Sequence, residues 1–475
     1  MNPAEKNIGP EMIGALAAIV GESAVIADSD ALVDYGHDEF SLREIACEPG
    51  AVVKPASTEE TAAVLRLAAS WSVPITPRGG GTGLCGGCVP APGGLVLSLE
   101  RMNRVVEIDT DNQVAVVEAG VRLGEFARAA EEAGLYFPPH PGDESAMIGG
   151  LIATNAGGSR AVKYGVIRNY VRGLDVVLAG GDVLRLGGKY VKSSAGYNLI
   201  HLLIGSEGTL GVITRAVIQL MVKPSHTRSL VIPFDDLAPA LEAVPQMLNR
   251  GIVPMAVEFM ERDVLALAEE HLNRRWPSDI GTTHLLVILD APSAGEMERV
   301  SEAVAEVCLE SGALDVFVAD TPARQDNVLA IRSRMYEAVK ALTVEILDIC
   351  LPRAEVAAHV EKVRELAGEL DIWLPTFGHA GDGNIHTHIM KARIRDNRVV
   401  PMAEGEWQPR AEQVREALFR DCRERGGVVS GEHGIGLVKK PYLYLTAGDR
   451  QIGLMKGIKT VFDPGGLLNP GKIFE

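Results

Sequence analysis

The first hundred residues alternate apolar and polar positions with two different periods. Residues 10–22 repeat apolar side chains at helical spacing. Ala51–Lys54 and Val73–Thr76 are short apolar runs of strand length, and the amphipathic stretch Thr58–Ser72 lies between them. The pattern therefore predicts an N-terminal helix followed by two strands that a second helix connects.

The length and spacing of the apolar segments then change twice along the chain. From Leu95 to Leu220 most apolar segments are short and β-branched, with glycine turns between them and one helix near Leu123–Ala133. After residues 223–225, strands alternate with helices of a dozen or more residues. The last fifty residues return to glycine- and proline-rich turns, so we expect the chain to come back to its first domain. The predicted divisions are a helical segment, a first domain, a second domain and a C-terminal segment: 1–46, 47–225, 226–425 and 426–475.

Composition excludes several classes of protein. The 475 residues carry a formal net charge of −17, which argues against nucleic acid or an anionic membrane as a partner because both need a basic face. No apolar run is long enough to span a membrane, and the N-terminus has no basic signal-peptide region. Six scattered cysteines fit reduced thiols. We therefore expect a cytoplasmic globular protein.

The longest glycine cluster is PRGGGTGLCGGCVP, residues 77–90. It contains a formal G-x-G-x-x-G match from Gly81 to Gly86, but Gly86–Pro90 cannot continue into the helix that a Rossmann turn requires. Consecutive glycines can still present backbone N–H groups to a phosphate, with Arg78 and Thr82 as further donors. A flexible surface loop is the alternative.

Cys85 and Cys88 lie inside this loop with two residues between them. A four-thiolate metal site needs a second such pair, and the remaining cysteines are not clustered. We therefore expect two small residues packed under the loop, in preference to a redox pair or an iron–sulfur ligand set.

The stretch FGHAGDGNIHTHI, residues 377–389, concentrates three histidines. If Ile385–Met390 is a strand, His386 and His388 point to the same face, and the glycine turn can bring His379 beside them. Two such imidazoles could bind one metal ion at about 2.0–2.1 Å. VVSGEHGIG offers Glu432 and His433 for a charged ligand. Ordinary core or surface histidines are the alternative.

Two further motifs help to decide between a phosphate-binding loop and a flexible surface loop. They are PPHPGDESAMIGGLIATNAGGSRAVKYG (138–165) and IGSEGTLGVITRAVI (204–218). Together with the glycine loop they resemble the flavoprotein family typified by vanillyl-alcohol oxidase, in its branch of D-lactate, glycolate and D-2-hydroxyglutarate dehydrogenases. The resemblance extends from about Pro49 to Phe474. It implies an α+β fold with an FAD-binding domain of the vanillyl-alcohol-oxidase type, a ferredoxin-like α/β substrate domain, and a C-terminal segment that returns to complete the flavin site.

The resemblance also implies which residues contact FAD. His140 and Met147 depart from the family pattern, where many relatives have Asp and Thr, and we expect non-covalent flavin binding. The implied contacts come from the glycine loop, the two later motifs and the C-terminal NPGK sequence: Pro77, Arg78, Gly79, Gly80, Gly81, Thr82, Gly83, Leu84, Pro141, Gly142, Gly149, Gly150, Thr154, Asn155, Gly158, Gly165, Glu207, Ile213 and Asn469.

GHAGDGNIH resembles the family's G-H-x-G-D-G-N-x-H signature. This implies that His379, His386 and Glu432 bind a divalent metal, with zinc as the first candidate and manganese or iron as alternatives. His433 is then the catalytic base. The implied reaction is oxidation of a 2-hydroxy acid to the 2-oxo acid, with the metal as a Lewis acid and hydride transfer to flavin N5.

The substrate carboxylate needs a cation, and QDNVLAIRSRMYEAVK offers Arg332. The resemblance to the family's substrate arginine favours Arg332 over Arg334, and the apolar residues before it suggest a partly buried turn. Tyr336 one turn later could assist. His388 stands where relatives that bind a second carboxylate often have Asn, and Ile346 stands where 2-hydroxyglutarate enzymes usually have Lys. Both favour a short substrate such as D-lactate or glycolate.

Two alternatives remain at this stage: a dehydrogenase for D-2-hydroxyglutarate or another dicarboxylate, and a non-catalytic FAD subunit of a larger oxidoreductase. The sequence shows no second redox centre, so the reduced flavin needs an electron-accepting protein. An electron-transfer flavoprotein, an iron–sulfur subunit or a quinone-linked complex are the candidates. A homodimer is left open.

Overall fold

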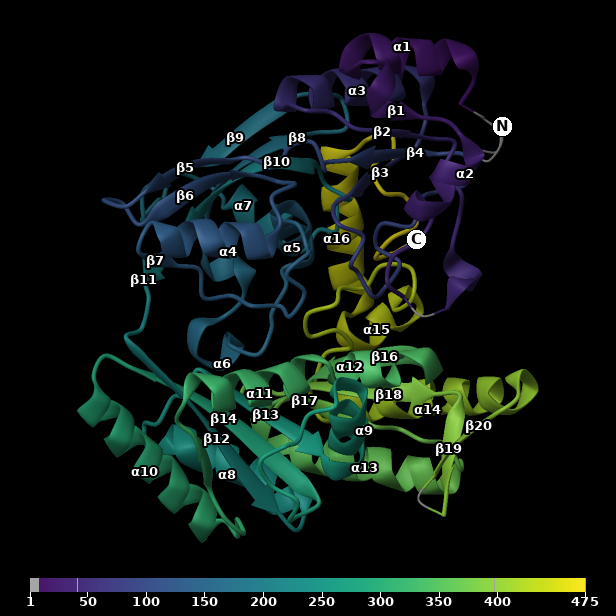
Figure 1. Ribbon diagram of the computed structural model, residues 1–475. Helices are drawn as coiled ribbons and strands as arrows, with labels where there is room; N and C mark the ends of the chain where they lie inside the picture. The colour runs from purple at the N-terminus through teal and green to yellow at the C-terminus, as the bar shows by residue number, and fades with distance from the viewer. Residues whose placement is uncertain (1–7, 41, 397, 475) are drawn as a thin grey trace. The chain divides into compact units, whose positions relative to one another are not determined.

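The computed structural model describes residues 8–40, 42–396 and 398–474 (Figure 1). The chain forms two compact units. Unit 1 consists of Met1–Ala156, Val166–Lys223 and Glu432–Glu475, and unit 2 consists of Gly157–Gly165 and Pro224–Gly431. Each unit has its own sheets and core. Among the described residues, no helix has both the length and the apolar character needed to cross a membrane.

The first sheet of unit 1 contains the predicted β–α–β unit. Helix α3 (Thr58–Trp71) connects strands β2 and β3, and its first turn is capped by the Ser57 hydroxyl, which accepts from the Glu60 amide at 3.1 Å. The apolar face of α3 is buried against α1 (Pro10–Val20). Strands β2, β4 and β3 are parallel, and the sheet order is β1-β2-β4-β3: Val25–Ile26, Ala51–Val53, Leu95–Ser98 and Ile75–Arg78.

The second sheet of unit 1 is antiparallel and has five strands in the order β5-β6-β10-β8-β9. Helices α4 (Leu123–Glu132) and α5 (Ile148–Thr154) follow β6 along the chain, as Figure 1 shows. A short pair, β7 (Leu135–Tyr136) with β11 (Met221–Val222), lies beside it. The five strands are Val105–Asp109, Val114–Glu118, Val212–Gln219, Val171–Val177 and Val183–Gly187.

The C-terminal segment returns to unit 1, as predicted. It contains the short helix α15 (Leu443–Thr446) and the longer α16 (Asp449–Phe462). Leu468 then forms a parallel bridge with Ile75 in β3, and the Asn469 amide donates to the Ile75 carbonyl at 2.7 Å. The end of the chain is therefore bonded to the strand from which the glycine loop starts.

Unit 2 is built on a seven-stranded sheet with the order β15-β12-β14-β13-β17-β18-β16. Its first four strands have the ferredoxin-like βαββαβ order, with α8 (Leu237–Asn249) and α10 (Ala294–Glu310) as the connecting helices. These strands pair antiparallel throughout. They are β12 His226–Phe234, β13 Ala256–Glu261, β14 Thr283–Ala291 and β15 Phe317–Ala319.

The other three strands repeat this order in a second, incomplete half. Its strands are β16 (Thr343–Cys350), β17 (Thr376–His379) and β18 (Asn384–Met390), and its helices are α13 and α14, Val356–Glu369 and Glu404–Glu424. Where a fourth strand would pair with β16, one antiparallel bridge joins Val428 to Cys350. The two halves meet where β13 pairs with β17. A hairpin of β19 (Ala392–Arg395) and β20 (Arg398–Pro401) follows β18 along the chain and forms a separate two-stranded sheet.

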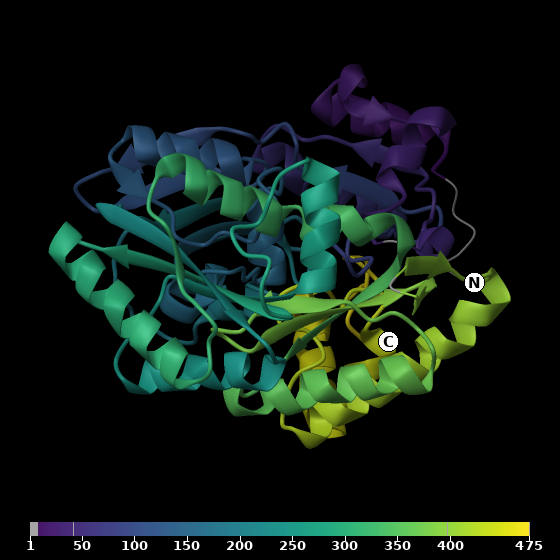
Figure 2. The same ribbon diagram turned by 60° about the horizontal axis from the view of Figure 1, so that its bottom comes forward.

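Helices cover both faces of this sheet (Figure 2). The connecting helices α8, α10, α13 and α14 lie on one face, and α9 (Arg262–Leu272), α11 (Pro322–Ser333) and α12 (Met335–Val339) lie on the other. Phe377 and Met390 belong to the core that α9, α11 and α12 cover. Because side chains alternate along a strand, His379, His386 and His388 share this second face.

Candidate active site

The three predicted histidines lie on the adjacent strands β17 and β18. The His379 and His386 rings are 5.1 Å apart between centroids and nearly perpendicular, at 87°. The turn between the strands is closed by Gly383, whose amide donates to the His379 carbonyl at 3.0 Å and whose φ is +88°. A Cβ there would come within 2.2 Å of the Leu351 carbonyl oxygen, so the turn requires glycine. The predicted strand and turn are therefore present and bring the two imidazoles together.

Glu258 of β13 binds both His379 and Arg332, and the sequence analysis missed it. Its Oε1 accepts from His379 Nδ1 at 2.6 Å, and its Oε2 accepts from Arg332 Nε at 2.7 Å and from Nη2. The carboxylate is fully buried. Burial raises the pKa of Glu258, but Arg332 and His379 outweigh it and bring the pKa down to about 2. A signal was available, because an acid within the apolar run of β13 needs a buried partner.

Arg332 lies in the last turn of α11, where it is partly buried, whereas Arg334 is exposed. Its guanidinium also lies over the Phe377 ring, 5.5 Å from the centroid. Of the two arginines considered, Arg332 is thus the one held against the histidine face.

His388 is enclosed by aromatic rings. It stacks on Phe377 at 4.7 Å with an interplanar angle of 23°, and Tyr336 of α12 lies 5.7 Å away. The Lys340 ammonium lies over the Tyr336 ring, 5.6 Å from its centroid. His388 and Tyr336 therefore form one aromatic wall beside the His379–His386 pair.

Asp348 of β16 is a second buried acid that the sequence analysis did not assign. It is the cross-strand partner of His386, whose Nδ1 lies 3.8 Å from Asp348 Oδ1. The same carboxylate accepts from Asn384 Nδ2 and from Ser430 Oγ, both at 2.8 Å. This network joins the start of β18 to the segment that follows α14.

The residues after α14 run along the edge strand β16. The Gly431 amide donates to the Asp348 carbonyl at 3.0 Å. Glu432 and His433 follow directly and are the first residues of the C-terminal part of unit 1. Consecutive Cα atoms are about 3.8 Å apart, so the peptide bond alone keeps Glu432 near the anchored Gly431.

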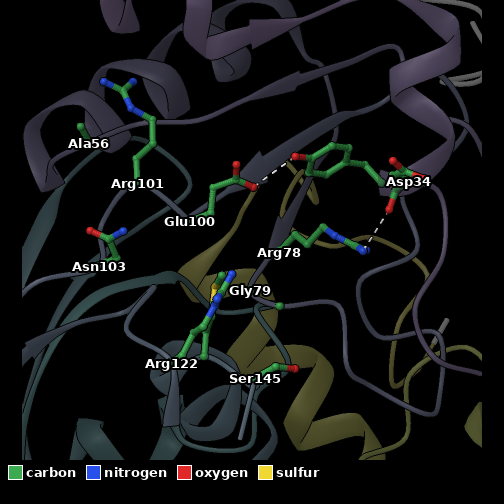
Figure 3. Close-up of a pocket in the computed structure, with 12 residues that line it drawn as sticks. Asp34, Ala56, Arg78, Gly79, Glu100, Arg101, Asn103, Arg122 and Ser145 are labelled. Carbon is green, nitrogen blue, oxygen red and sulfur yellow. Dashed lines mark hydrogen bonds between the residues drawn. The ribbon is translucent and has the colours of Figure 1, made fainter. Parts of the chain in front are cut away.

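In unit 1 the predicted phosphate loop leaves β3 and forms no helix before α4, so it is not a Rossmann turn. A cavity of about 800 Å³ opens beside it. Its lining combines the loop backbone with polar side chains, and Figure 3 shows Arg78, Gly79, Glu100, Arg122 and Ser145 around it. The loop therefore borders a cavity that is large enough for part of a dinucleotide.

Arg78 binds the N-terminal segment in addition to lining this cavity. Its guanidinium donates to the His37 carbonyl at 2.6 Å. It also donates to the Asp34 carbonyl at 3.1 Å (Figure 3). It also contacts the Cys88 sulfur at 3.1 Å. Burial raises the pKa of the Cys88 thiol to about 11, which favours the unreactive protonated form.

The glycines of the second motif fall into three structural groups. Gly149 begins α5 against the sheet, because a Cβ there would lie 2.6 Å from the Ala119 Cβ, whereas the position above Gly150 is open. Asn155 caps the helix in the left-handed conformation. Gly158 and Gly165, by contrast, belong to unit 2, where Val162 between them packs against Gly381 of the histidine turn.

Glu207 and Asn469 hold the C-terminal segment within unit 1. The Glu207 carboxylate accepts from the Ile435 and Gly436 amides, each at 2.8 Å. Asn469 Nδ2 donates to the carbonyls of Glu207 and Gly87 at 2.7 and 2.9 Å. Both residues have positive φ. The remaining predicted residues lie in the glycine loop, in the turn before α5, at the end of α5 and in β10: Pro77, Gly80, Gly81, Thr82, Gly83, Leu84, Pro141, Gly142, Thr154 and Ile213.

Comparison with known proteins agrees with this architecture. Residues 223–473 match the family model of the FAD linked oxidases, C-terminal domain, and residues 49–187 match an FAD binding domain. The chain therefore belongs to the FAD-linked oxidases, and it is an FAD-linked oxidoreductase of the group that contains D-lactate, glycolate and D-2-hydroxyglutarate dehydrogenases.

Three curated relatives are similar over most of their length. A D-lactate dehydrogenase of Anaerostipes hadrus is 40% identical, with 98% of each chain covered. A D-lactate dehydrogenase of Archaeoglobus fulgidus is 44% identical, covering 90% of this chain and 92% of the relative. The glycolate oxidase subunit GlcD of Bacillus subtilis is 38% identical, covering 90% and 89%. Among solved structures, p-cresol methylhydroxylase has a TM-score of 0.78 at 18% identity, covering 97% and 96%, which confirms the predicted fold.

Proposed function

We propose that this protein is an FAD- and divalent-metal-dependent dehydrogenase that oxidises D-lactate or glycolate to the 2-oxo acid. The observation that carries the proposal is the placement of two buried imidazoles and one arginine on a single face of the unit 2 sheet, with Glu258 bonded to both His379 and Arg332. A 2-hydroxy acid presents a hydroxyl and a carboxylate on adjacent carbons. Such a molecule needs a Lewis acid and a cation close together.

The donor set suits a divalent metal. His379 has its Nδ1 engaged by Glu258, which leaves Nε2 as the nitrogen for a metal, and the His386 ring lies 5.1 Å away. Glu432, which follows the anchored Gly431, supplies the carboxylate. Two imidazoles and one carboxylate are the donors of many catalytic zinc sites and leave open positions for substrate. When bound, the metal supplies Lewis acidity that lowers the pKa of the substrate hydroxyl.

The chain's own residues then bind and orient the acid. Arg332 pairs with the substrate carboxylate, and a guanidinium can do so through two parallel hydrogen bonds. Tyr336 and His388, whose rings lie 5.7 Å apart, are assigned to the wall that faces the side chain of the acid and excludes water from it. His433 takes the hydroxyl proton as general base. FAD, held by the residues around the glycine loop, would supply the two-electron acceptor that the oxidation requires.

FAD binding is assigned to the cavity beside the glycine loop and to the residues around it. The backbone amides of residues 79–84 suit the pyrophosphate, because adjacent N–H groups form an anion-binding concavity. Further proposed FAD contacts come from the 138–165 motif: Pro141, Gly142, Gly149, Gly150, Thr154 and Asn155. Gly158, Gly165 and Ile213 complete the proposed set. Glu207 and Asn469 support it by fixing the C-terminal segment.

The reduced flavin must pass its electrons on. We propose that a separate protein accepts them, either an electron-transfer flavoprotein or an iron–sulfur subunit. A relative of this chain is named as a subunit of glycolate oxidase, which supports a partner of this kind.

An anaerobic titration tests the proposal. The purified protein is expected to show the visible spectrum of oxidised flavin, and D-lactate or glycolate should bleach it. Removal of the metal by a chelator should stop the bleaching, and added zinc or manganese should restore it. A protein without flavin colour would contradict the proposal. Colour that no acid bleaches would favour the non-catalytic subunit, and bleaching that survives complete metal removal would exclude metal dependence.

A further inference from the structure

Glu258 joins two groups to which the proposed function gives different tasks. One oxygen of its carboxylate binds the imidazole of His379 and the other binds the guanidinium of Arg332. A buried carboxylate shared in this way constrains both partners at once, because neither can rotate without breaking a charge-assisted hydrogen bond. It contacts no reacting atom itself, so any role it has must act through these two side chains.

The bond to His379 fixes the tautomer of the ring. An ionised carboxylate accepts hydrogen bonds and cannot donate them, so His379 Nδ1 must carry a hydrogen at this 2.6 Å contact. In the neutral imidazole the lone pair then lies on Nε2. A metal binds a nitrogen through its lone pair, so Glu258 selects the one nitrogen of His379 that can act as a ligand.

The bond to Arg332 selects an edge of the guanidinium. Nε and Nη2 face Glu258. Among the described residues, Nη1 has no hydrogen-bond partner, and Nη2 has a second hydrogen. The Nη1–Nη2 edge of the guanidinium is therefore directed away from Glu258. This is the edge that can bind a carboxylate through two parallel hydrogen bonds.

The backbone places Glu258 where both contacts are possible. It is paired with His379 in the register of β13 and β17, the two strands at which the halves of the unit 2 sheet meet. Arg332 reaches it from the last turn of α11, which covers this face. A group held on paired strands varies less in position than a group on a loop.

We propose that Glu258 is a positioning residue that sets both the metal-binding tautomer of His379 and the substrate-facing orientation of Arg332. This inference rests on the proposed function of the site. It adds that one side chain holds both the proposed metal ligand His379 and the proposed carboxylate-binding residue Arg332 in place.

Replacement of Glu258 by glutamine should affect its contact with His379 and its contact with Arg332 differently. An amide has one accepting oxygen and one donating nitrogen, so it cannot accept from both partners. The charged guanidinium is the stronger donor and is expected to keep the oxygen. The amide nitrogen would then donate to His379 Nδ1, which moves the ring hydrogen to Nε2 and blocks metal binding.

The test measures cobalt(II) binding to the full-length FAD-containing protein through the visible absorption of the bound ion. Glu258→Gln is expected to weaken cobalt binding by about 10- to 100-fold, the usual range for loss of such a partner. At saturating metal, the KM for D-lactate should change less than about 3-fold in this variant. Glu258→Ala, which loses both contacts, should weaken cobalt binding and also raise that KM by about 10-fold or more.

Glu345→Gln is the matched control, because Glu345 is also buried in the unit 2 sheet and pairs with an arginine, Arg415, at 2.8 Å. It should bind cobalt as the wild type does. Equal cobalt affinity in the wild type and Glu258→Gln would overturn the inference, and so would equal losses in Glu258→Gln and the control. If the glutamine variant fails to fold, Glu258→Asp must restore part of the affinity that alanine loses, and an aspartate variant no better than alanine would also overturn it.

Failure of the proposed function is distinguishable, since cobalt binding requires no substrate. A wild-type protein that binds no cobalt would refute the metal site itself. A wild-type protein that binds cobalt and depends on Glu258, but is not reduced by any 2-hydroxy acid, would refute the reaction and leave the role of Glu258 toward His379 intact.

Discussion

Ile346 lies directly opposite His388 in the antiparallel register of β16 and β18. Side chains of directly opposed residues lie on the same face of a sheet, about 4.5–5.5 Å apart at their Cβ atoms. Ile346, which is aliphatic, therefore lies beside the aromatic wall of Tyr336 and His388. A second carboxylate on the substrate would find no cation from this strand position.

Replacing Ile346 with lysine should move the substrate preference toward a dicarboxylate. We expect Ile346→Lys combined with His388→Asn to raise the ratio of kcat/KM for D-2-hydroxyglutarate to that for D-lactate by at least about 10-fold, which corresponds to one charge-assisted hydrogen bond. Ile346→Leu keeps the volume and should leave the ratio unchanged. Steady-state kinetics with an artificial electron acceptor measures both. An unchanged ratio in the double variant would show that this wall does not face the substrate side chain.

His433→Ala should keep both FAD and metal but slow flavin reduction by about 10²-fold or more, the usual loss when a general base is removed. Stopped-flow reduction by D-lactate under anaerobic conditions gives the rate, and the visible spectrum together with metal analysis gives the content of each group. His271, which is exposed on α9, provides the control variant His271→Ala. Reduction at the wild-type rate in His433→Ala would assign the base to another residue.

Glu207→Gln should loosen the segment that carries His433. The carboxylate accepts from two backbone amides, and glutamine can accept from only one while its own NH₂ group faces the other. We expect a loss of about 1–3 kcal/mol in the free energy of unfolding, the cost of a buried donor left unsatisfied. Urea unfolding measures it. Glu107→Gln is the control, since Glu107 is exposed and pairs with Lys189 at the surface of the same unit, and its effect should be smaller.

Protonation of His284 should destabilise unit 2 as the pH falls. This histidine is fully buried in β14, where Trp276 Nε1 donates to its Nδ1 at 3.1 Å. Burial, together with the nearby positive charge of Arg262, lowers the pKa of His284 from 6.5 to about 4. The unfolded chain therefore binds more protons between these values, so stability is fully present above pH 6.5 and is lost as the pH falls toward 4.

A shift of this size corresponds to about 3 kcal/mol of stability, because each pKa unit is worth about 1.4 kcal/mol. His284→Asn keeps an acceptor for Trp276 and removes the titration. Urea unfolding at pH 7 and pH 4.5 should therefore show a smaller pH dependence in this variant. His271→Asn should retain the full dependence of the wild type. Parallel pH profiles for the wild type and His284→Asn would contradict the assignment.

Local patterns in the sequence predicted the elements that depend on neighbouring residues. The helix α3 and the strand β18 follow from periodicity, and the glycine turn before β18 follows from the conformation that only glycine tolerates at Gly383. The return of the C-terminal segment was predicted from its composition and confirmed by the Leu468–Ile75 bridge. The family's motifs supplied the cofactor, which periodicity alone does not reveal.

The contacts made across long stretches of sequence could not be predicted. Glu258 lies 121 residues before His379 and meets it only because β13 and β17 are paired. Asp348 meets Ser430 across 82 residues for a similar reason. The partners of Arg78 are backbone carbonyls about forty residues upstream, and carbonyls have no identity in a sequence. Strand order decides the contact between Glu258 and His379, and a single sequence contains little information about strand order or about which loops meet.

The incomplete second half of the unit 2 sheet has an evolutionary consequence. A sheet that contains the same strand order twice is what duplication of one small domain would leave, and two identical copies would have carried no asymmetric site. The second half ends in the single Val428–Cys350 bridge, where the first half has the strand β15. The chain freed by this shortening continues into Glu432 and His433. In this view the loss of one strand released the segment that carries the proposed metal ligand Glu432 and the proposed base His433, and selection for the proposed function would preserve the shortened half.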